Sequence, residues 1–206
     1  MNVIQFSSPS LPPYSYKEIA RYMRANAENE DIKALIDQCI VECEGKITGK
    51  VIYRELPISC SEKELDLGFA KVKSKDLGKL LLNNNCHSII LFAATVGIGI
   101  DRLILKHSRL SPAKALCFQA IGAERVEALC DAFSLELKGK FESRGMALTP
   151  RFSPGYGDLP LTLQREIFAN LDCEKNLGIT LNTSLLMTPT KSVTAIIGIK
   201  GYKENT

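Results

Sequence analysis

The chain has 206 residues, of which 45% are hydrophobic and 24% are charged, as in an average soluble globular protein. Its net charge is only +3, and its Lys and Arg residues are spread along the whole chain. This distribution argues against a nucleic-acid-binding protein, which needs a concentrated basic surface.

The N-terminal segment has none of the features of a targeting sequence. It reads MNVIQFSSPSLPPY, with neither a basic start nor an apolar core, so we expect no signal peptide. The longest apolar stretch, Ile89 to Ile100, is interrupted by Thr95 and two glycines and is too short to cross a bilayer. We therefore expect a cytoplasmic protein that does not interact with membranes.

The seven cysteines form no CxxC pair. Only Cys39 and Cys43 are close, at a spacing that places both on one face of a helix. We expect reduced thiols that pack as small buried hydrophobes. The two histidines, His87 and His107, stand at no ligand-like spacing from any cysteine, so we predict no metal site.

The first quarter of the chain predicts two helices and a strand. Residues 1–15 are rich in Ser and Pro and are expected to form an extended lead-in. Apolar residues three or four apart predict a helix from Tyr16 and a second over about residues 30–44. Residues 47–58 are rich in Val, Ile and Tyr, which favours a strand, and Pro57 indicates its end or a sheet edge.

The next segment centres on a strand that we expect to be buried on both faces. Residues 64–72 are predicted as a short strand, and Ser74 is a typical N-cap for a helix that ends at the asparagines 83–85. Residues 88–95 form a continuous apolar run, as in a strand covered on both sides. The glycine-rich residues 96–99 suggest a nucleotide loop only weakly, because the GxGxxG spacing is absent.

The second half begins with a long helix. Ser111 followed by proline marks its start, and the helix is predicted to reach about Arg144. One seam of this helix is apolar and carries Val126, Leu129, Phe133 and Leu137. A Gly/Pro-rich loop is expected over residues 150–160, and a helix over about 162–171.

Two further β-like segments, around residues 178–181 and 193–200, complete the pattern. Helices and strands alternate without a regular βαβ rhythm, and no linker or repeat interrupts them. The sequence therefore predicts a single α+β domain over residues 1–206, with a mixed or antiparallel twisted sheet flanked by helices.

The loop from Arg151 to Asp158 is the segment best suited to bind a ligand. Its glycines allow a close approach of the backbone, Tyr156 offers an aromatic face, and the Arg151 guanidinium suits a carboxylate. An adenosyl amino acid needs these three features. An ordinary structural turn before a helix accounts for the same residues, and this alternative stays open.

Three sequence blocks in this order resemble the activation domain of vitamin B12-dependent methionine synthase. The segment RFSPGYGDLP, from Arg151, resembles the family's Arg-x-x-x-Gly-Tyr signature. Residues 177–182 resemble its Gly-hydrophobic-x-Leu-Thr segment, and residues 186–193 its Met-x-Pro-x-x-Ser-Val segment. The resemblance covers about residues 125–199 and is greatest to short, free-standing members, with residues 93–97 as the best anchor in the first half.

This resemblance implies an accessory subunit without a catalytic side chain of its own. In the family, the domain binds S-adenosylmethionine and docks on the cobalamin-carrying chain of methionine synthase. When the cofactor is oxidised to cob(II)alamin, a flavodoxin-type protein supplies an electron and S-adenosylmethionine supplies the methyl group. The cobalt is the nucleophile, so the protein contributes positioning.

The resemblance also implies a set of ligand-binding residues. Arg151 matches the arginine that holds the ligand carboxylate, and Ser153 matches a small residue whose backbone contacts the ligand. Gly155 and Tyr156 match the pair that lines the adenosine pocket. Asp131, in Leu-Cys-Asp-Ala-Phe, matches an acidic residue of the family, and its position off the apolar seam fits either a site role or a solvated carboxylate.

The sequence departs from the family pattern at three places. Gly157 stands where the family usually has proline, residues 145–148 offer no second carboxylate, and the final strand is followed only by residues 201–206. The family's tyrosine from the longer tail is therefore not assigned to Tyr202. Two alternatives remain: a non-catalytic interaction protein with the same fold, and a reactivator of another corrinoid methyltransferase.

Overall fold

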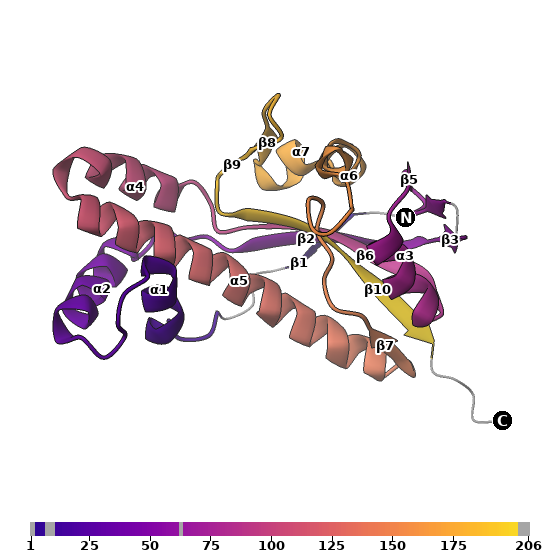
Figure 1. The fold of residues 1–206 in the computed structure, drawn as a ribbon, viewed down its shortest axis with the longest axis horizontal. Coiled ribbons are helices and arrows are strands. Elements are labelled where there is room, and N and C mark those ends of the chain that lie inside the picture. Colours follow the sequence, from indigo (N-terminus) through magenta and orange to yellow (C-terminus); the bar gives the residue numbers. More distant parts are fainter. Residues whose placement is uncertain (1–2, 7–10, 62–63, 202–206) are drawn as a thin grey trace.

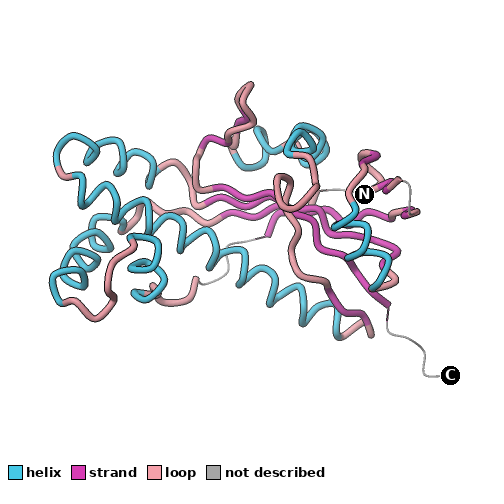
Figure 2. The backbone as a smooth tube through the Cα atoms, in the orientation of Figure 1, coloured by secondary structure: helices cyan, strands magenta, loops and turns pink. Residues whose placement is uncertain are grey.

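The computed structural model describes residues 3–6, 11–61 and 64–201, and it is built around a five-stranded antiparallel sheet (Figure 1). The strands lie in the order β1 (Ile4–Phe6), β2 (Lys50–Pro57), β6 (Cys86–Thr95), β10 (Ser192–Gly201) and β7 (Met146–Leu148). Figure 2 shows these strands as a central layer with helices on both sides. The predicted α+β class, with an antiparallel sheet flanked by helices, is confirmed.

Strand β6 lies at the centre of this sheet, between β2 and β10. Its residues alternate between two hydrophobic cores, so that Phe92 packs in one and Leu91 in the other, both fully buried. The continuous apolar run in the sequence is therefore the signature of a strand covered on both faces, as predicted.

One face of the sheet is covered by four helices (Figure 1). They are α1 (Tyr16–Met23), α2 (Glu30–Cys43), α4 (Gly99–Leu110) and α5 (Pro112–Glu142). Helix α5 begins as predicted, because the Ser111 hydroxyl accepts a hydrogen bond from the backbone N–H of Lys114 at 3.4 Å. Its Phe133 lies 5.0 Å from Phe92 and 5.4 Å from Tyr53, measured between ring centroids. This aromatic contact joins the long helix to the sheet.

Shorter elements cover the opposite face, where the second core lies. They are α3 (Lys75–Asn83), the 3-10 turn Leu161–Leu163, α6 (Gln164–Leu171) and α7 (Cys173–Leu177), with the small strands β3 (Ser59–Cys60), β4 (Leu65–Asp66), β5 (Lys71–Val72), β8 (Thr180–Leu181) and β9 (Met187–Thr188). Ser74 caps α3 as predicted, since its hydroxyl accepts from the N–H of Leu77 at 3.1 Å. Among the described helices, none is long and apolar enough to cross a membrane.

One prediction about secondary structure was wrong, and one helix was missed. Residues 64–72 are not one strand but the hairpin β4–β5, because Gly68 turns the chain with φ +77°. The glycine-rich residues 96–99 lead into helix α4, which was not predicted at all. No side chain caps its start at Ile98, so the usual signal for a helix N-terminus is missing from the sequence.

The lead-in contains a strand that the sequence did not reveal. Ile4–Phe6 pair with β2, with Ile4 opposite Tyr53 and Phe6 opposite Val51, and form one edge of the sheet. Three residues are too few for a periodic pattern to be visible. Of the remaining lead-in, residues 1–2 and 7–10 lie outside the described residues.

All seven cysteines are free, and six of them are buried, as expected for small core residues. The exception is Cys60, which is half-buried. Burial raises the pKa of the Cys43, Cys130 and Cys173 thiols to about 12. These thiols are therefore protonated and unreactive at neutral pH.

Candidate ligand-binding site

The loop over residues 150–160 leaves strand β7 and remains attached to the edge of the sheet. Phe152 and Ile196 of β10 form an isolated bridge in which each backbone N–H donates to the other residue's carbonyl at 2.9 Å. This bridge fixes the backbone directly after Arg151. The guanidinium is consequently attached to a rigid part of the chain.

The middle of this loop is a tight turn that exposes an aromatic ring. The N–H of Tyr156 donates to the Ser153 carbonyl at 3.1 Å, and the N–H of Gly155 donates to the Leu159 carbonyl at 2.9 Å. Gly155 has φ +87°, which a residue with a side chain rarely adopts. The Tyr156 ring packs edge-on against Phe152, with centroids 5.4 Å apart, yet 69% of its surface is exposed. The turn therefore presents one aromatic face to solvent.

Arg151 reaches across to two carboxylates of helix α5. Its Nη2 lies 2.7 Å from Asp131 Oδ1 and 3.2 Å from Glu127 Oε2. The Arg151 side chain is 25% exposed, against 71% for Asp131 and 47% for Glu127. The structure thus brings together Arg151 and Asp131, two residues chosen from the sequence. It adds Glu127, whose signal was its position one helical turn before Asp131.

The end of the loop is held by the first turn of helix α3. The Asp158 carboxylate accepts hydrogen bonds from the Ser74 hydroxyl at 2.5 Å, the Lys75 N–H at 2.6 Å and the Asp76 N–H at 3.2 Å. These bonds, chiefly the one from the Ser74 hydroxyl, lower the pKa of the Asp158 carboxyl below its usual value. Sequence reasoning missed this role of Asp158, because its partners are more than eighty residues away.

Gly157 explains one departure from the family pattern. Its φ is +54°, whereas proline is restricted to about −65°. A Cβ at this position would also collide with the Asp76 carboxylate. The loop conformation in this chain is therefore incompatible with the proline that the family usually has.

A hollow of about 590 Å³ lies beside the Arg151 cluster, between helix α5 and the N-terminal segment. Glu127 and Asp131 belong to its lining, together with Pro12, Pro13, Ser15, Glu18, Tyr22, Glu124, Ala128, Ala132 and Leu135. The acidic groups exceed the basic ones in this lining. The hollow is therefore suited to a ligand that carries a positive charge.

The N-terminal wall of this hollow is anchored by a buried ion pair in α5. Arg125 and Glu124 contact each other, and their side chains are 3% and 6% exposed. Arg125 donates to the Pro12 carbonyl at 2.8 Å and the Pro13 carbonyl at 3.2 Å, and its guanidinium lies 4.0 Å from the centre of the Tyr14 ring. Residues 12–14 are thus fixed by the helix that carries the Arg151 partners.

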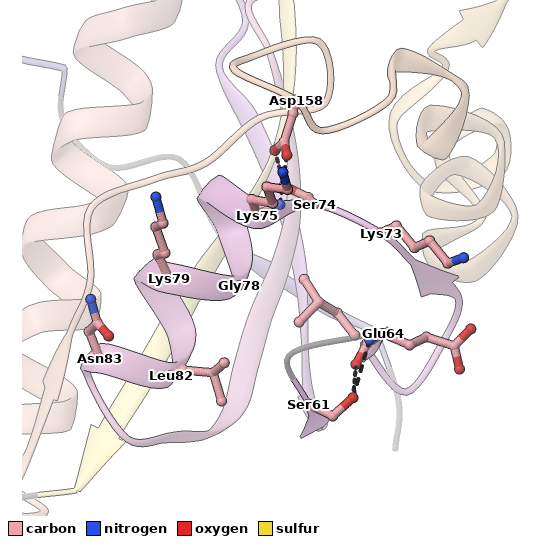
Figure 3. A pocket seen from close by; sticks show the side chains of 11 residues that line it. Ser61, Glu64, Lys73, Ser74, Lys75, Gly78, Lys79, Leu82, Asn83 and Asp158 are labelled. Carbon is pink, nitrogen blue, oxygen red and sulfur yellow. Dashed lines mark hydrogen bonds between the residues drawn. The ribbon is translucent and has the colours of Figure 1, made fainter.

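A second hollow, of about 510 Å³, is lined in part by Asp158 (Figure 3). Its lining includes Lys73, Lys75 and Lys79 as well as Glu64. Figure 3 shows Lys73 and Lys79 directed away from each other, while Asp158 reaches the first turn of α3. The lysines do not converge on one point, so we place the candidate site at Arg151.

The Arg151 cluster and the Tyr156 turn together contain groups that can bind a zwitterionic amino acid attached to a flat ring. The planar Arg151 fork can bind a carboxylate, Glu127 and Asp131 can bind an ammonium or sulfonium group, and Tyr156 can stack on a ring. The first two functions come from the ion-pair cluster. The third comes from the turn that contains the other residues chosen from the sequence, Ser153 and Gly155.

Comparison with known proteins supports the fold assignment. No protein-family model matches the sequence, and no curated protein matches it either. A solved structure does match, the MetH reactivation domain bound to AdoHcy, with a TM-score of 0.68 and 13% sequence identity over all of this chain and 81% of that domain. The chain therefore has the fold of a MetH reactivation domain.

Proposed function

We propose that this chain is an S-adenosylmethionine-binding reactivation subunit that supports reductive methylation of cob(II)alamin in a cobalamin-dependent methionine synthase. The proposal rests mainly on the contact of Arg151 with Glu127 and Asp131, at the start of a loop that also exposes Tyr156. The likeness to a reactivation domain that binds AdoHcy supports it, because AdoHcy differs from S-adenosylmethionine only by the methyl group and its charge.

The residues of the site fit the parts of this ligand. Arg151 would bind the ligand carboxylate, and Glu127 and Asp131 would then pair with the ammonium group. Tyr156 and the backbone of Gly155 would line the adenosine, with the Ser153 backbone beside them. The ligand would replace the internal ion pairs of Arg151 by equivalent ones, so no charge is left unpaired.

The partner in this account is the cobalamin-binding chain of methionine synthase, and a flavodoxin-type protein supplies the electron. S-adenosylmethionine supplies the methyl group when bound. The side chains of this protein hold the ligand in a fixed orientation towards the partner's cofactor, and none acts as a nucleophile. We propose that the chain acts as a single domain in the cytoplasm.

A second candidate is an interaction protein with this fold that does not bind the ligand. The charge balance around Arg151 favours it, because the guanidinium already has two carboxylate partners within the chain. A third candidate, a reactivator of another corrinoid methyltransferase, uses the same site with a different partner. The experiment below separates these three.

The test is recovery of inactive methionine synthase, followed by the absorbance of cob(II)alamin on the partner chain. We expect cob(II)alamin to disappear when reductant, S-adenosylmethionine and this chain are all present. Arg151→Ala should abolish this effect, while Arg165→Ala, an exposed arginine of helix α6, should not. Equal recovery with and without the chain would contradict the proposal. Recovery only on another corrinoid protein would favour the third candidate.

A further inference from the structure

The hydrogen bonds of Asp158 join two parts of the chain that are distant in sequence. Helix α3 offers the Ser74 hydroxyl and the N–H groups of Lys75 and Asp76 at its N-terminus. The Ser74 hydroxyl also caps the helix locally, because its oxygen accepts a hydrogen bond from the N–H of Leu77. Asp158 adds a second acceptor at this helix end, and it comes from the loop over residues 150–160, which we call the ligand loop (Figure 3).

The contact is close along the whole end of the loop. Gly157 lies so close to the Asp76 carboxylate that a Cβ would displace it, and its φ of +54° is one that few other residues adopt. The N–H of Leu159 donates to the Tyr156 carbonyl at 3.1 Å, and the Leu159 carbonyl accepts from Gly155. The anchor at Asp158 is therefore continuous with the turn that exposes Tyr156.

We propose that Asp158 is a positioning residue for the ligand loop: its carboxylate fixes the turn on helix α3 and so pre-organises Gly155 and Tyr156. This inference adds a residue to the proposed function and rests on it for the effect on ligand binding. Its effect on the loop itself does not depend on the identity of the ligand. A loop that is already ordered loses less conformational freedom when a ligand binds.

The first test follows hydrogen exchange of single amides by nuclear magnetic resonance in the full chain at pH 7. In Asp158→Asn, we expect the amides of Gly155 and Leu159 to exchange at least tenfold faster, while amides of β6 are unchanged. Asp158→Glu retains the charge and should recover part of the protection. If only the amides of Lys75 and Asp76 accelerate, Asp158 merely caps α3 and the proposal is overturned.

The second test measures S-adenosylmethionine affinity by calorimetry for the same variants. We expect the dissociation constant of Asp158→Asn to be roughly tenfold higher, because a charge-assisted anchor is lost. Asp158→Glu should recover part of the affinity. Glu166→Gln, an exposed carboxylate of α6, is the control and should bind like the wild type. Faster loop exchange with unchanged affinity would overturn the link to binding. If the wild type does not bind S-adenosylmethionine, the proposed function fails, and the exchange of the loop amides still decides the positioning role.

Discussion

Arg151 is the residue at which the loop and helix α5 meet. Its partners Asp131 and Glu127 are 71% and 47% exposed, so each ion pair is screened by water and contributes little to folding. A cluster of this kind costs little stability to open. It can therefore exchange its internal partners for the charged groups of a ligand.

This arrangement predicts which part of the ligand each residue recognises. We expect Glu127→Gln to weaken S-adenosylmethionine binding about two- to fivefold, because one partly exposed ion pair is lost. Binding of 5′-methylthioadenosine, which lacks the amino acid end, should be unchanged. Competition titrations with both compounds check this, and an equal loss for both would place Glu127 near the adenosine instead.

Gly157 predicts a cost in stability from its backbone and its neighbour. Gly157→Ala should lower the free energy of unfolding by about 1–3 kcal/mol, because the positive φ is strained and the new Cβ meets the Asp76 carboxylate. Gly139→Ala is the matched control, since a Cβ there has no neighbour within 4 Å inside helix α5. It should stabilise the chain by about 0.5–1 kcal/mol. Urea unfolding of both variants measures the difference. An equal change in the free energy of unfolding would contradict the cost assigned to a side chain at Gly157.

At the scale of elements, helix α5 connects most of the described parts of the molecule. It packs on the sheet through Phe133, carries the carboxylates that meet Arg151, and holds the N-terminal segment through Arg125. The ion pair of Arg125 with Glu124 is buried, unlike the pairs of Arg151. Its loss should therefore affect folding more strongly than ligand recognition.

Arg125→Met leaves the Glu124 carboxylate buried without its cationic partner. We expect the free energy of unfolding to fall by about 3 kcal/mol or more. The double variant Arg125→Met with Glu124→Leu should recover much of this loss, because no unpaired charge remains. Urea unfolding of the two variants tests this, and a double variant as unstable as the single one would argue against it.

The contact of helix α2 with α4 and α5 at Glu42 predicts that stability depends on pH. Glu42 of α2 bonds Lys114 of α5 at 2.6 Å and His107 of α4 at 3.0 Å, and the pKa of its carboxyl is lowered chiefly by the Lys114 bond. A lowered pKa stabilises the fold above the unfolded value of about 4.3 and ceases to do so as the pH falls through the folded value. Between pH 6 and 3, the urea midpoint should fall less steeply in Glu42→Gln than in the wild type. Parallel curves would show that this contact does not contribute.

At the scale of the whole molecule, the elements with local signals were predictable and the long-range contacts were not. The apolar run of β6 and the Ser-Pro start of α5 are visible in the sequence, because burial and capping act over a few residues. Helix α4 has no capping side chain, and the three residues of β1 are too few for a pattern. The roles of Glu127 and Asp158 depend on partners that only the folded chain brings near.

The most direct measurement is a calorimetric titration of S-adenosylmethionine into the purified chain, with Arg151→Ala alongside. We predict saturable binding to the wild type that is lost in the variant, because the ligand carboxylate then has no guanidinium partner. Arg165→Ala should bind like the wild type. No binding by the wild type, alone or with a cobalamin-carrying partner present, would contradict the account. The chain would then be better explained as an interaction protein that has this fold and does not bind the ligand.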